Sequence, residues 1–185
     1  MNKKTFDIQG PLLFSTLYRN NARRTIVETF REDWFEDSLC GNVPNFVQEN
    51  QSMSKSKGTM RGMHFQCPPH AQGKLIKCLS GAILDVSVDI RKSSPTFGQH
   101  VSAKLTPENG FVLWVPEGFL HGFLTLADNT IVQYKCTDYY TADCEISVVW
   151  NDPDLNIDWG ISNDDVIISD RDSEGIAMAN FSSPF

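Results

Sequence analysis

The sequence predicts an all-β fold, a sandwich or a small barrel, formed by a single domain over residues 1–185. Three observations favour it. Short runs of β-branched and aromatic residues recur along the chain, and turn-forming residues separate them at intervals of roughly eight to twelve positions. The sequence contains no internal repeat, low-complexity segment or linker. A chain of 185 residues is also of ordinary length for one domain.

The first part of the chain is expected to form short strands, a short helix and turns. The predicted elements before residue 60 are an edge strand and a turn within 6–17, a strand at 25–30, a short helix at 32–39, a strand at 45–50 and a polar turn at 52–58. Pro11 suits an edge strand because it has no N–H to donate to a neighbour.

The rest of the chain contains most of the predicted strands. They are expected at 61–66, 72–78, 82–90, 101–105, 111–115, 119–126 and 131–136, with turns at 94–98 and 106–110 between them. Residues 151–185 are expected to form an irregular extension over the barrel. Within it, the Ser-x-x-Asp pattern from Ser169 to Asp172 predicts a helix start, which gives Asp172 a capping role.

The strands at 61–66 and 72–78 form the centre of the functional prediction. Because side chains alternate along a strand, one face is expected to carry Arg61, Met63 and Phe65, and the other Gly62, His64 and Gln66. Lys74 on the next strand shares a face with Gln72 and Ile76. A histidine and a lysine on adjacent strands favour a place where a proton moves and negative charge is held. The alternative interpretation is a hydrogen-bonded core histidine beside a surface lysine.

The strand at 82–90 contains an unusual carboxylate. Its period of two places one set on one face, Ile83, Asp85, Ser87 and Asp89, and the other set opposite, Leu84, Val86 and Val88. A buried Asp is costly unless it meets a cation. We therefore expect Asp85 to pair with Lys74.

Composition restricts the function classes. The chain is 41% hydrophobic and 21% charged, which is typical of a soluble globular protein. A net charge of -7, a pI of about 5.0 and the absence of a basic stripe argue against nucleic acid as a partner. A single anionic small molecule needs only a few local Arg or Lys side chains. No apolar run approaches the length of a membrane span, so no membrane association is expected.

Cysteine usage and the amino terminus predict a cytoplasmic location. Five cysteines without a Cys-x-x-Cys spacing suit reduced thiols rather than a disulfide framework or a zinc site. The polar residues after Met1 are not followed by the apolar region of a signal peptide.

The motifs narrow the chemistry to acid–base work without a metal. His64 and His121 stand alone in sequence, while His70 and His100 lie in turn or edge contexts, and no His-x-His is present. Neither a Gly-x-Ser-x-Gly nucleophile motif nor a glycine-rich phosphate loop occurs. What remains is a His base, a Lys that stabilises an oxyanion, an Asp that orients the His, and a Tyr acid.

Six motifs in order resemble the dTDP-4-dehydrorhamnose 3,5-epimerase family over roughly residues 20–175. They are RGMHFQ at 61–66, QGKL at 72–75, DVSVDIR at 85–91, SPTFG at 94–98, WVPEGFLHGF at 114–123 and YKCTDYY at 134–140. The resemblance implies a cupin-type double-stranded β-helix, or jelly roll, with short flanking helices and a C-terminal extension. It also implies a homodimer that uses no metal or cofactor and inverts carbons alpha to the 4-keto group of a nucleotide-diphosphate-linked 6-deoxysugar.

The resemblance assigns five catalytic roles. His64 would take the proton from C5 or C3, and Lys74 would stabilise the resulting charge on the C4 oxygen. Asp85 would hold Lys74 in place and charged. Tyr134 would return a proton from the opposite face of the sugar, and Asp172 would orient His64.

The same resemblance implies a set of binding residues. Arg61 would bind the diphosphate and His121 would line the sugar site. Gln48 and Asn50 would lie near the nucleotide, and Tyr139 would also bind the substrate. Two further residues would come from the partner subunit, Arg23 as a phosphate ligand and Glu28 as an acid that contacts the base.

One segment departs from the family pattern, which reads Asp-Glu-Arg-Gly-Phe-Phe-x-Glu. Here Arg24 replaces the Gly, and Thr25 and Ile26 replace two aromatics, one of which would stack on thymine. A GDP- or CDP-linked 4-keto sugar is therefore an alternative to the dTDP sugar. The same motifs also suit a 3-only or 5-only epimerase, a ketoisomerase, or a sugar-binding jelly roll without catalysis.

Overall fold

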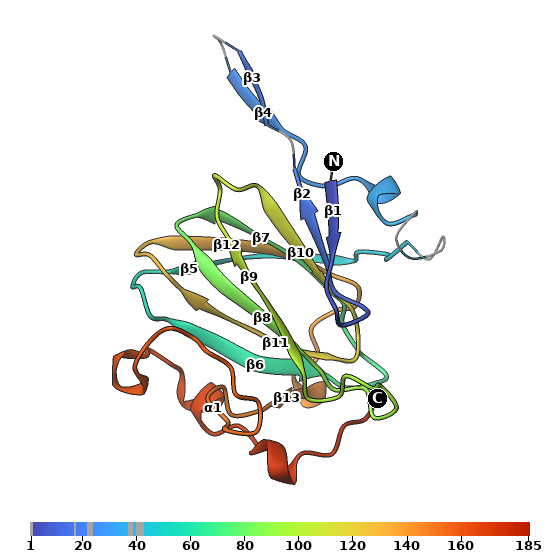
Figure 1. Cartoon of the computed structure of the whole chain (residues 1–185), viewed down its shortest axis with the longest axis vertical. Coiled ribbons are helices and arrows are strands. Elements are labelled where there is room, and N and C mark those ends of the chain that lie inside the picture. Colours follow the sequence, from blue (N-terminus) through green and yellow to red (C-terminus); the bar gives the residue numbers. More distant parts are fainter. Residues whose placement is uncertain (1, 17, 22–23, 37–38, 40–42) are drawn as a thin grey trace.

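Two antiparallel sheets packed face to face form the body of the protein, seen here as a computed structural model (Figure 1). The first sheet has the strand order β1-β2-β10-β7-β12-β5, and the second has the order β13-β6-β11-β8-β9. The structure describes residues 2–16, 18–21, 24–36, 39 and 43–185. This arrangement confirms the predicted all-β sandwich.

The strands closely follow the prediction from residue 60 onwards. The first sheet consists of β1 (Asn2–Thr5), β2 (Leu12–Ser15), β5 (Gln48–Ser54), β7 (Lys74–Ser80), β10 (Phe111–Val115) and β12 (Thr130–Cys136). The second consists of β6 (Met60–Gln66), β8 (Ile83–Asp89), β9 (His100–Leu105), β11 (Phe119–Thr125) and β13 (Glu145–Ser147). The helical turns are η1 (Glu32–Trp34), η2 (Ala142–Cys144), η3 (Asn163–Asp165), α1 (Asp170–Ser173) and η4 (Met178–Asn180).

Three apolar cores lie in successive layers. The central one fills the space between the sheets and includes Ile76 and Leu113 from the first sheet and Leu105 and Phe123 from the second. The segment around η1 covers the outer face of the first sheet, and the C-terminal segment covers the outer face of the second. Both faces of β11 are therefore buried along its whole length. Each fully buried Leu, Ile or Phe contributes about 1.5–3 kcal/mol, which anchors both sheets.

The predictions before residue 60 were less accurate. Strand β5 extends to Ser54, through residues expected to form a polar turn, because its backbone pairs with β12 from Gln48↔Cys136 to Thr130↔Ser54. An edge strand with one solvated face tolerates this polar alternation. The predicted strand at 25–30 ends at Val27 in β4 (Arg24–Val27), and the described part of the predicted helix at 32–39 has one 3-10 turn.

Strands β3 (Tyr18–Asn21) and β4 form a hairpin that projects away from the body (Figure 1). It belongs to neither main sheet, and within the described residues these strands pair only with one another. The position predicted for Arg23 lies outside the described residues. No helix in the described ranges has the length and apolar character needed to cross a membrane.

A bulge in β6 overturns part of the predicted alternation. His121 of β11 lies opposite His64, whereas Phe123 lies opposite Arg61, so β6 has one residue more than its neighbour over this interval. Gly62 within the bulge has φ +104, and a Cβ there would lie 2.6 Å from the His121 carbonyl oxygen. The bulge brings Arg61 onto the same cavity as His64, although strict alternation placed them on opposite faces.

Candidate active site

A cleft between the two sheets contains two adjoining chambers. The first chamber, about 210 Å³ in volume, is lined by Ser52, Arg61, His64, Lys74, Ile76, His121, Phe123, Tyr134, Glu145, Ser169, Arg171 and Asp172. The second chamber, about 460 Å³, shares His64, Lys74, Tyr134, Glu145 and Arg171 and adds Gln48, Asn50, Gln51, Phe65, Gln66, Gln72, Cys136 and Tyr140. The structure thus brings together most of the residues that the sequence predicted for the site.

His64 is a partly buried imidazole, with 24% of its side chain exposed, whose lowered pKa favours the neutral form. Burial lowers the pKa of His64 well below its usual value, and the positive charge of Lys74 lowers it further. The Nδ1 atom of His64 lies 4.0 Å from Oε1 of Glu145 and has no hydrogen-bond partner among the described residues. A neutral imidazole whose ring lines a cavity can accept a proton at neutral pH.

Lys74 is a nearly buried ammonium group, with 8% of the residue exposed. Burial lowers the pKa of Lys74, while the nearby Cys136, Glu145 and Asp85 oppose this effect. A positive charge on Lys74 lies in a setting of low dielectric, where it interacts strongly with any negative charge that develops beside it.

The predicted ion pair between Asp85 and Lys74 is wrong. Asp85 Oδ1 lies 2.9 Å from His121 Nε2, and both side chains are buried. Asp85 and His121 are diagonal neighbours on β8 and β11 of the second sheet, whereas Lys74 belongs to the first sheet. Asp85 therefore pairs with His121 of its own sheet, and it influences Lys74 of the other sheet through its charge.

Tyr134 approaches the first chamber from the sheet opposite His64. It lies on β12 of the first sheet, in register with Ile76 and Asn50, and His64 lies on β6 of the second sheet. Burial raises the pKa of Tyr134, and the positive charge of Arg61 opposes that rise. Tyr134 therefore keeps its phenolic proton at neutral pH and can serve as an acid.

Asp172 makes different contacts from those predicted. Its backbone N–H donates to Ser169 Oγ over 3.2 Å, which confirms the predicted helix cap at the start of α1. Its Oδ2 accepts a bond from the Gly62 N–H at 3.3 Å, and none of its described hydrogen bonds reaches His64. The carboxylate that lies 4.0 Å from His64 Nδ1 is that of Glu145. Asp172 is therefore bonded to the bulge in β6, two residues before His64.

Comparison with known proteins decides the family. A model of the dTDP-4-dehydrorhamnose 3,5-epimerase family matches residues 5–180. The chain is also 42% identical over 175 residues to the dTDP-4-dehydrorhamnose 3,5-epimerase of Shigella flexneri, covering 95% of this chain and 94% of the relative. The chain belongs to the dTDP-4-dehydrorhamnose 3,5-epimerase family.

Solved structures agree with this assignment. The dTDP-6-deoxy-D-glucose-3,5-epimerase of Legionella pneumophila, in complex with dTDP-4-keto-L-rhamnose, superposes with a TM-score of 0.91 at 37% identity, covering 98% of this chain and 94% of that one. A 3'-monoepimerase of Streptomyces bikiniensis, in complex with dTDP-quinovose, gives a TM-score of 0.85 at 32% identity, covering 94% and 86%. The predicted jelly roll of this epimerase family is thereby confirmed.

The second chamber contains residues that the family resemblance did not supply. Tyr139, predicted to bind substrate, is 63% exposed and lines neither chamber, whereas Tyr140 lines the second. The Tyr140 hydroxyl donates to Glu145 Oε2 at 2.8 Å, and Arg171 forms an ion pair with the same Glu145 oxygen. The YKCTDYY motif pointed to Tyr140, but no sequence pattern singled out Glu145 or Arg171.

Of the remaining predicted binding residues, two line the second chamber and one lies outside both chambers. Gln48 Nε2 donates to Asn50 Oδ1 at 3.2 Å, and both residues line the second chamber. Glu28 is exposed, forms an ion pair with Arg31 at 3.6 Å and lines neither chamber of its own chain.

The described residues include no candidate metal site. They contain no group of three or more His, Cys, Asp or Glu side chains that could bind a metal ion. Catalysis without a metal stays a prediction that the composition of the chambers suits.

Proposed function

We propose that this member of the family inverts C3 and C5 of dTDP-4-keto-6-deoxyglucose by removing protons alpha to the C4 ketone. One observation carries the proposal. A neutral imidazole, a buried ammonium and a protonated phenol line the same chamber, and the imidazole and the phenol come from opposite sheets. These are the groups that an enolate mechanism with inversion requires.

The proposed reaction at each carbon has two proton transfers. His64 removes the proton, and the electron pair of the broken C–H bond moves through C4 onto the ketone oxygen. Lys74 stabilises that oxygen as it becomes negative. Tyr134 then donates its proton to the carbon from the opposite face, which inverts the centre. Exchange with solvent restores His64 and Tyr134 to their starting protonation states.

We assign supporting roles to the neighbouring side chains. Asp85 orients His121 at the sugar and keeps negative charge near Lys74. Asp172 bonds the Gly62 amide and so fixes the strand that carries His64. Arg61 binds the diphosphate. No cofactor takes part.

Incorporation of solvent deuterium tests the reaction directly. The protein is incubated with dTDP-4-keto-6-deoxyglucose in D₂O, and NMR follows exchange at C3 and C5. A 3,5-epimerase exchanges both positions and forms the 4-keto-L-rhamnose product. A sugar-binding jelly roll without catalysis exchanges neither position, and that result would refute the proposal.

A 3-only epimerase is the second candidate. The observation that favours it is the likeness to the 3'-monoepimerase of Streptomyces bikiniensis, which covers 94% of this chain. The same deuterium experiment separates the candidates, because the 3-only enzyme gives net inversion at C3 alone. Inversion at C3 without inversion at C5 would assign this chain to the 3-only epimerases.

We propose dTDP as the nucleotide and the second chamber as its site. The polar groups of Gln48 and Asn50 line that chamber, as does the half-exposed ring of Tyr140. Stacking of a base on an aromatic ring contributes about 1–3 kcal/mol, so Tyr140 offers an aromatic face in a chain whose residues 25 and 26 are not aromatic. In a thermal-shift panel, dTDP should stabilise the protein more than GDP or CDP at equal concentration. A larger shift with GDP or CDP would replace dTDP as the assigned nucleotide.

We further propose a cytoplasmic homodimer in which the active sites are shared. The projecting β3–β4 hairpin leaves edge backbone groups open to a partner sheet, and Glu28 lies outside the chambers of its own chain. Exposed charge pairs contribute only about 0–1 kcal/mol, so stability alone is a weak reason for Glu28 and Arg23. The cysteines in the described ranges are unpaired thiols, which suits a reducing compartment.

Mixing two inactive variants tests the shared site. In mixed dimers of Arg23→Ala and His64→Ala subunits, one of the two sites contains neither substitution, so activity should return on subunit exchange. If the mixture stays inactive after exchange has been demonstrated by mass spectrometry, each site belongs to a single chain.

A further inference from the structure

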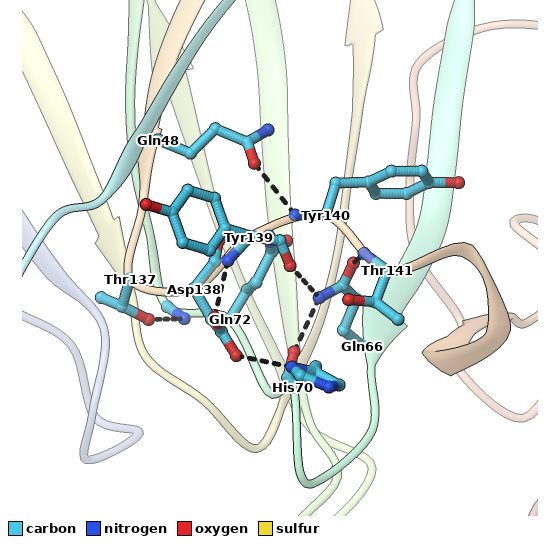
Figure 2. A network of polar contacts seen from close by, with 10 residues as sticks. Gln48, Gln66, His70, Gln72, Thr137, Asp138, Tyr139, Tyr140 and Thr141 are labelled. Atoms are coloured by element: carbon cyan, nitrogen blue, oxygen red, sulfur yellow. Dashed lines mark hydrogen bonds and ion pairs between the residues drawn. The ribbon is translucent and has the colours of Figure 1, made fainter.

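The loop of residues 137–141, here called the tyrosine loop, is fixed by side chains from other elements. It follows β12 and carries Tyr139 and Tyr140 (Figure 2). The Tyr140 N–H donates to Gln48 Oε1 at 2.9 Å, and the Thr141 N–H donates to Gln66 Oε1 at 2.7 Å. Side chains here perform the task that a partner strand performs in a sheet, so the position of the loop depends on particular residues.

Gln66 makes the largest contribution to this arrangement. Besides accepting from Thr141, its Nε2 donates to the carbonyl oxygens of His70 at 2.7 Å and Tyr139 at 3.1 Å (Figure 2). Both N–H groups of the carboxamide are thus engaged, and only 4% of the residue is exposed. Gln66 therefore bonds the tyrosine loop at two points and the β6–β7 loop at one.

A second link joins the same two loops. His70 Nδ1 lies 3.1 Å from Asp138 Oδ2, and Gln72 Nε2 donates to the Asp138 carbonyl oxygen at 2.7 Å. His70 lines neither chamber, so its side chain can influence the cavity only through the loop.

These contacts fix the position of Tyr140. Half of this residue is exposed, so packing alone does not set its position. Its hydroxyl nevertheless reaches Glu145 at 2.8 Å and accepts from Arg171 Nη1 at 3.1 Å, and all three residues line the second chamber. We propose that Gln66 is a positioning residue for the nucleotide sugar, which acts by holding the tyrosine loop so that Tyr140 stands at the second chamber beside Glu145 and Arg171.

This inference rests on the proposed function and predicts a specific kinetic signature. Gln66→Leu removes all three hydrogen bonds while keeping a side chain of similar size. We expect KM for dTDP-4-keto-6-deoxyglucose and Kd for dTDP, measured by calorimetry, to rise at least tenfold. The kcat value at saturation should stay within about threefold, because the first chamber is unchanged.

A double-mutant cycle with Tyr140→Ala separates positioning from direct contact with the ligand. If Gln66 acts through Tyr140, most of the tenfold penalty should vanish when Gln66→Leu is made in the Tyr140→Ala background. His70→Ala should also raise KM, but by less than Gln66→Leu. If Gln66→Leu fails to fold, His70→Ala tests the inference in its place.

A matched control measures the effect of losing any buried loop clamp. Thr16 is also buried, and its Oγ1 donates to the Gly110 carbonyl oxygen at 2.8 Å, away from both chambers. Thr16→Val should lower the unfolding midpoint and leave KM and Kd unchanged.

Three outcomes would overturn the inference. They are an unchanged KM in folded Gln66→Leu, an undiminished penalty in the Tyr140→Ala background, or, where Gln66→Leu does not fold, an unchanged KM in His70→Ala. A wild-type protein that neither binds dTDP nor exchanges deuterium would instead refute the proposed function, so the two failures are distinguishable.

Discussion

The two chambers of the cleft differ in how well their polar atoms are satisfied. Around the first chamber, Ser52 Oγ, His64 Nδ1 and Asp85 Oδ2 are buried without a hydrogen-bond partner among the described residues. Beside the second, the amides of Tyr139, Tyr140 and Thr141 all meet side-chain oxygens at 2.7–2.9 Å. The first chamber thus has several unpartnered polar atoms beside it, whereas the backbone amides of residues 139–141 beside the second chamber are all paired.

This difference is expected from the tasks that we propose. An unpaired buried polar atom costs stability, so several beside one cavity mark that region as a candidate for function rather than for stability. The positive charges on Lys74, Arg61 and Arg171 also lower the pKa of His64, which favours the unprotonated ring that a general base requires. A binding wall gains instead from rigidity, because less freedom is lost when the ligand arrives.

Removing the base is the largest perturbation of the first chamber. His64→Ala should lower deuterium exchange at both C3 and C5 by a thousandfold or more, because each step begins with the same imidazole. NMR of the substrate in D₂O measures this loss, and circular dichroism checks the fold. His100→Ala, on β9 outside both chambers, serves as the control. Exchange retained at C5 in folded His64→Ala would remove His64 from the role of base.

Removing the acid should affect one half of the reaction. Tyr134→Phe is expected to reduce the rate of net inversion by at least about a hundredfold, because a general acid typically contributes about 10²–10⁴-fold to the rate. Wash-in of deuterium by His64 should fall much less, because Tyr134 acts after the enolate has formed. Equal loss of exchange and inversion would show that Tyr134 serves the first step or the structure.

The pKa of His64 tests the electrostatics of the first chamber. Because that pKa lies well below 6.5, the imidazole stays neutral as pH falls through 6.5, and kcat/KM should not decline there. The unfolded chain binds that proton near pH 6.5, so folding stability should fall as pH drops from 6.5 towards the lower folded pKa. In Lys74→Met, NMR titration should find the His64 pKa raised but still below 6.5, since burial remains. An unchanged pKa would mean that the charge on Lys74 does not reach the imidazole.

The smallest predicted effects compare one hydroxyl beside each chamber. Ser52 Oγ is unpartnered, so Ser52→Ala should change the free energy of unfolding by no more than about 0.5 kcal/mol. Thr137 Oγ1 accepts from the Gly73 N–H at 2.8 Å, so Thr137→Val should cost about 1–2 kcal/mol. Urea titration measures both, and equal costs would contradict the difference between the two walls.

Local patterns were enough to predict the strands from residue 60 to residue 136 and several of the site residues. The period of two in 82–90 correctly placed Ile83 towards the central core and Val86 and Val88 towards the outer one, because a strand that is buried on both faces still obeys alternation. Likewise, Gln72, Lys74 and Ile76 share the cleft face as their spacing predicted. Family motifs added Tyr134 and His121, which alternation alone did not connect with His64.

Contacts between distant segments decided the rest. The sequence by itself determined an all-β chain with a histidine and a lysine on consecutive strands, and the fold places those strands in opposite sheets. Only the tertiary structure placed Arg61 beside His64, because the bulge depends on Gly62 lying against the His121 carbonyl. It also paired Asp85 with His121 rather than Lys74, and brought Glu145 and Arg171, 26 positions apart, into one ion pair. Such choices depend on which sheet each strand joins, and no spacing within a single strand encodes that information.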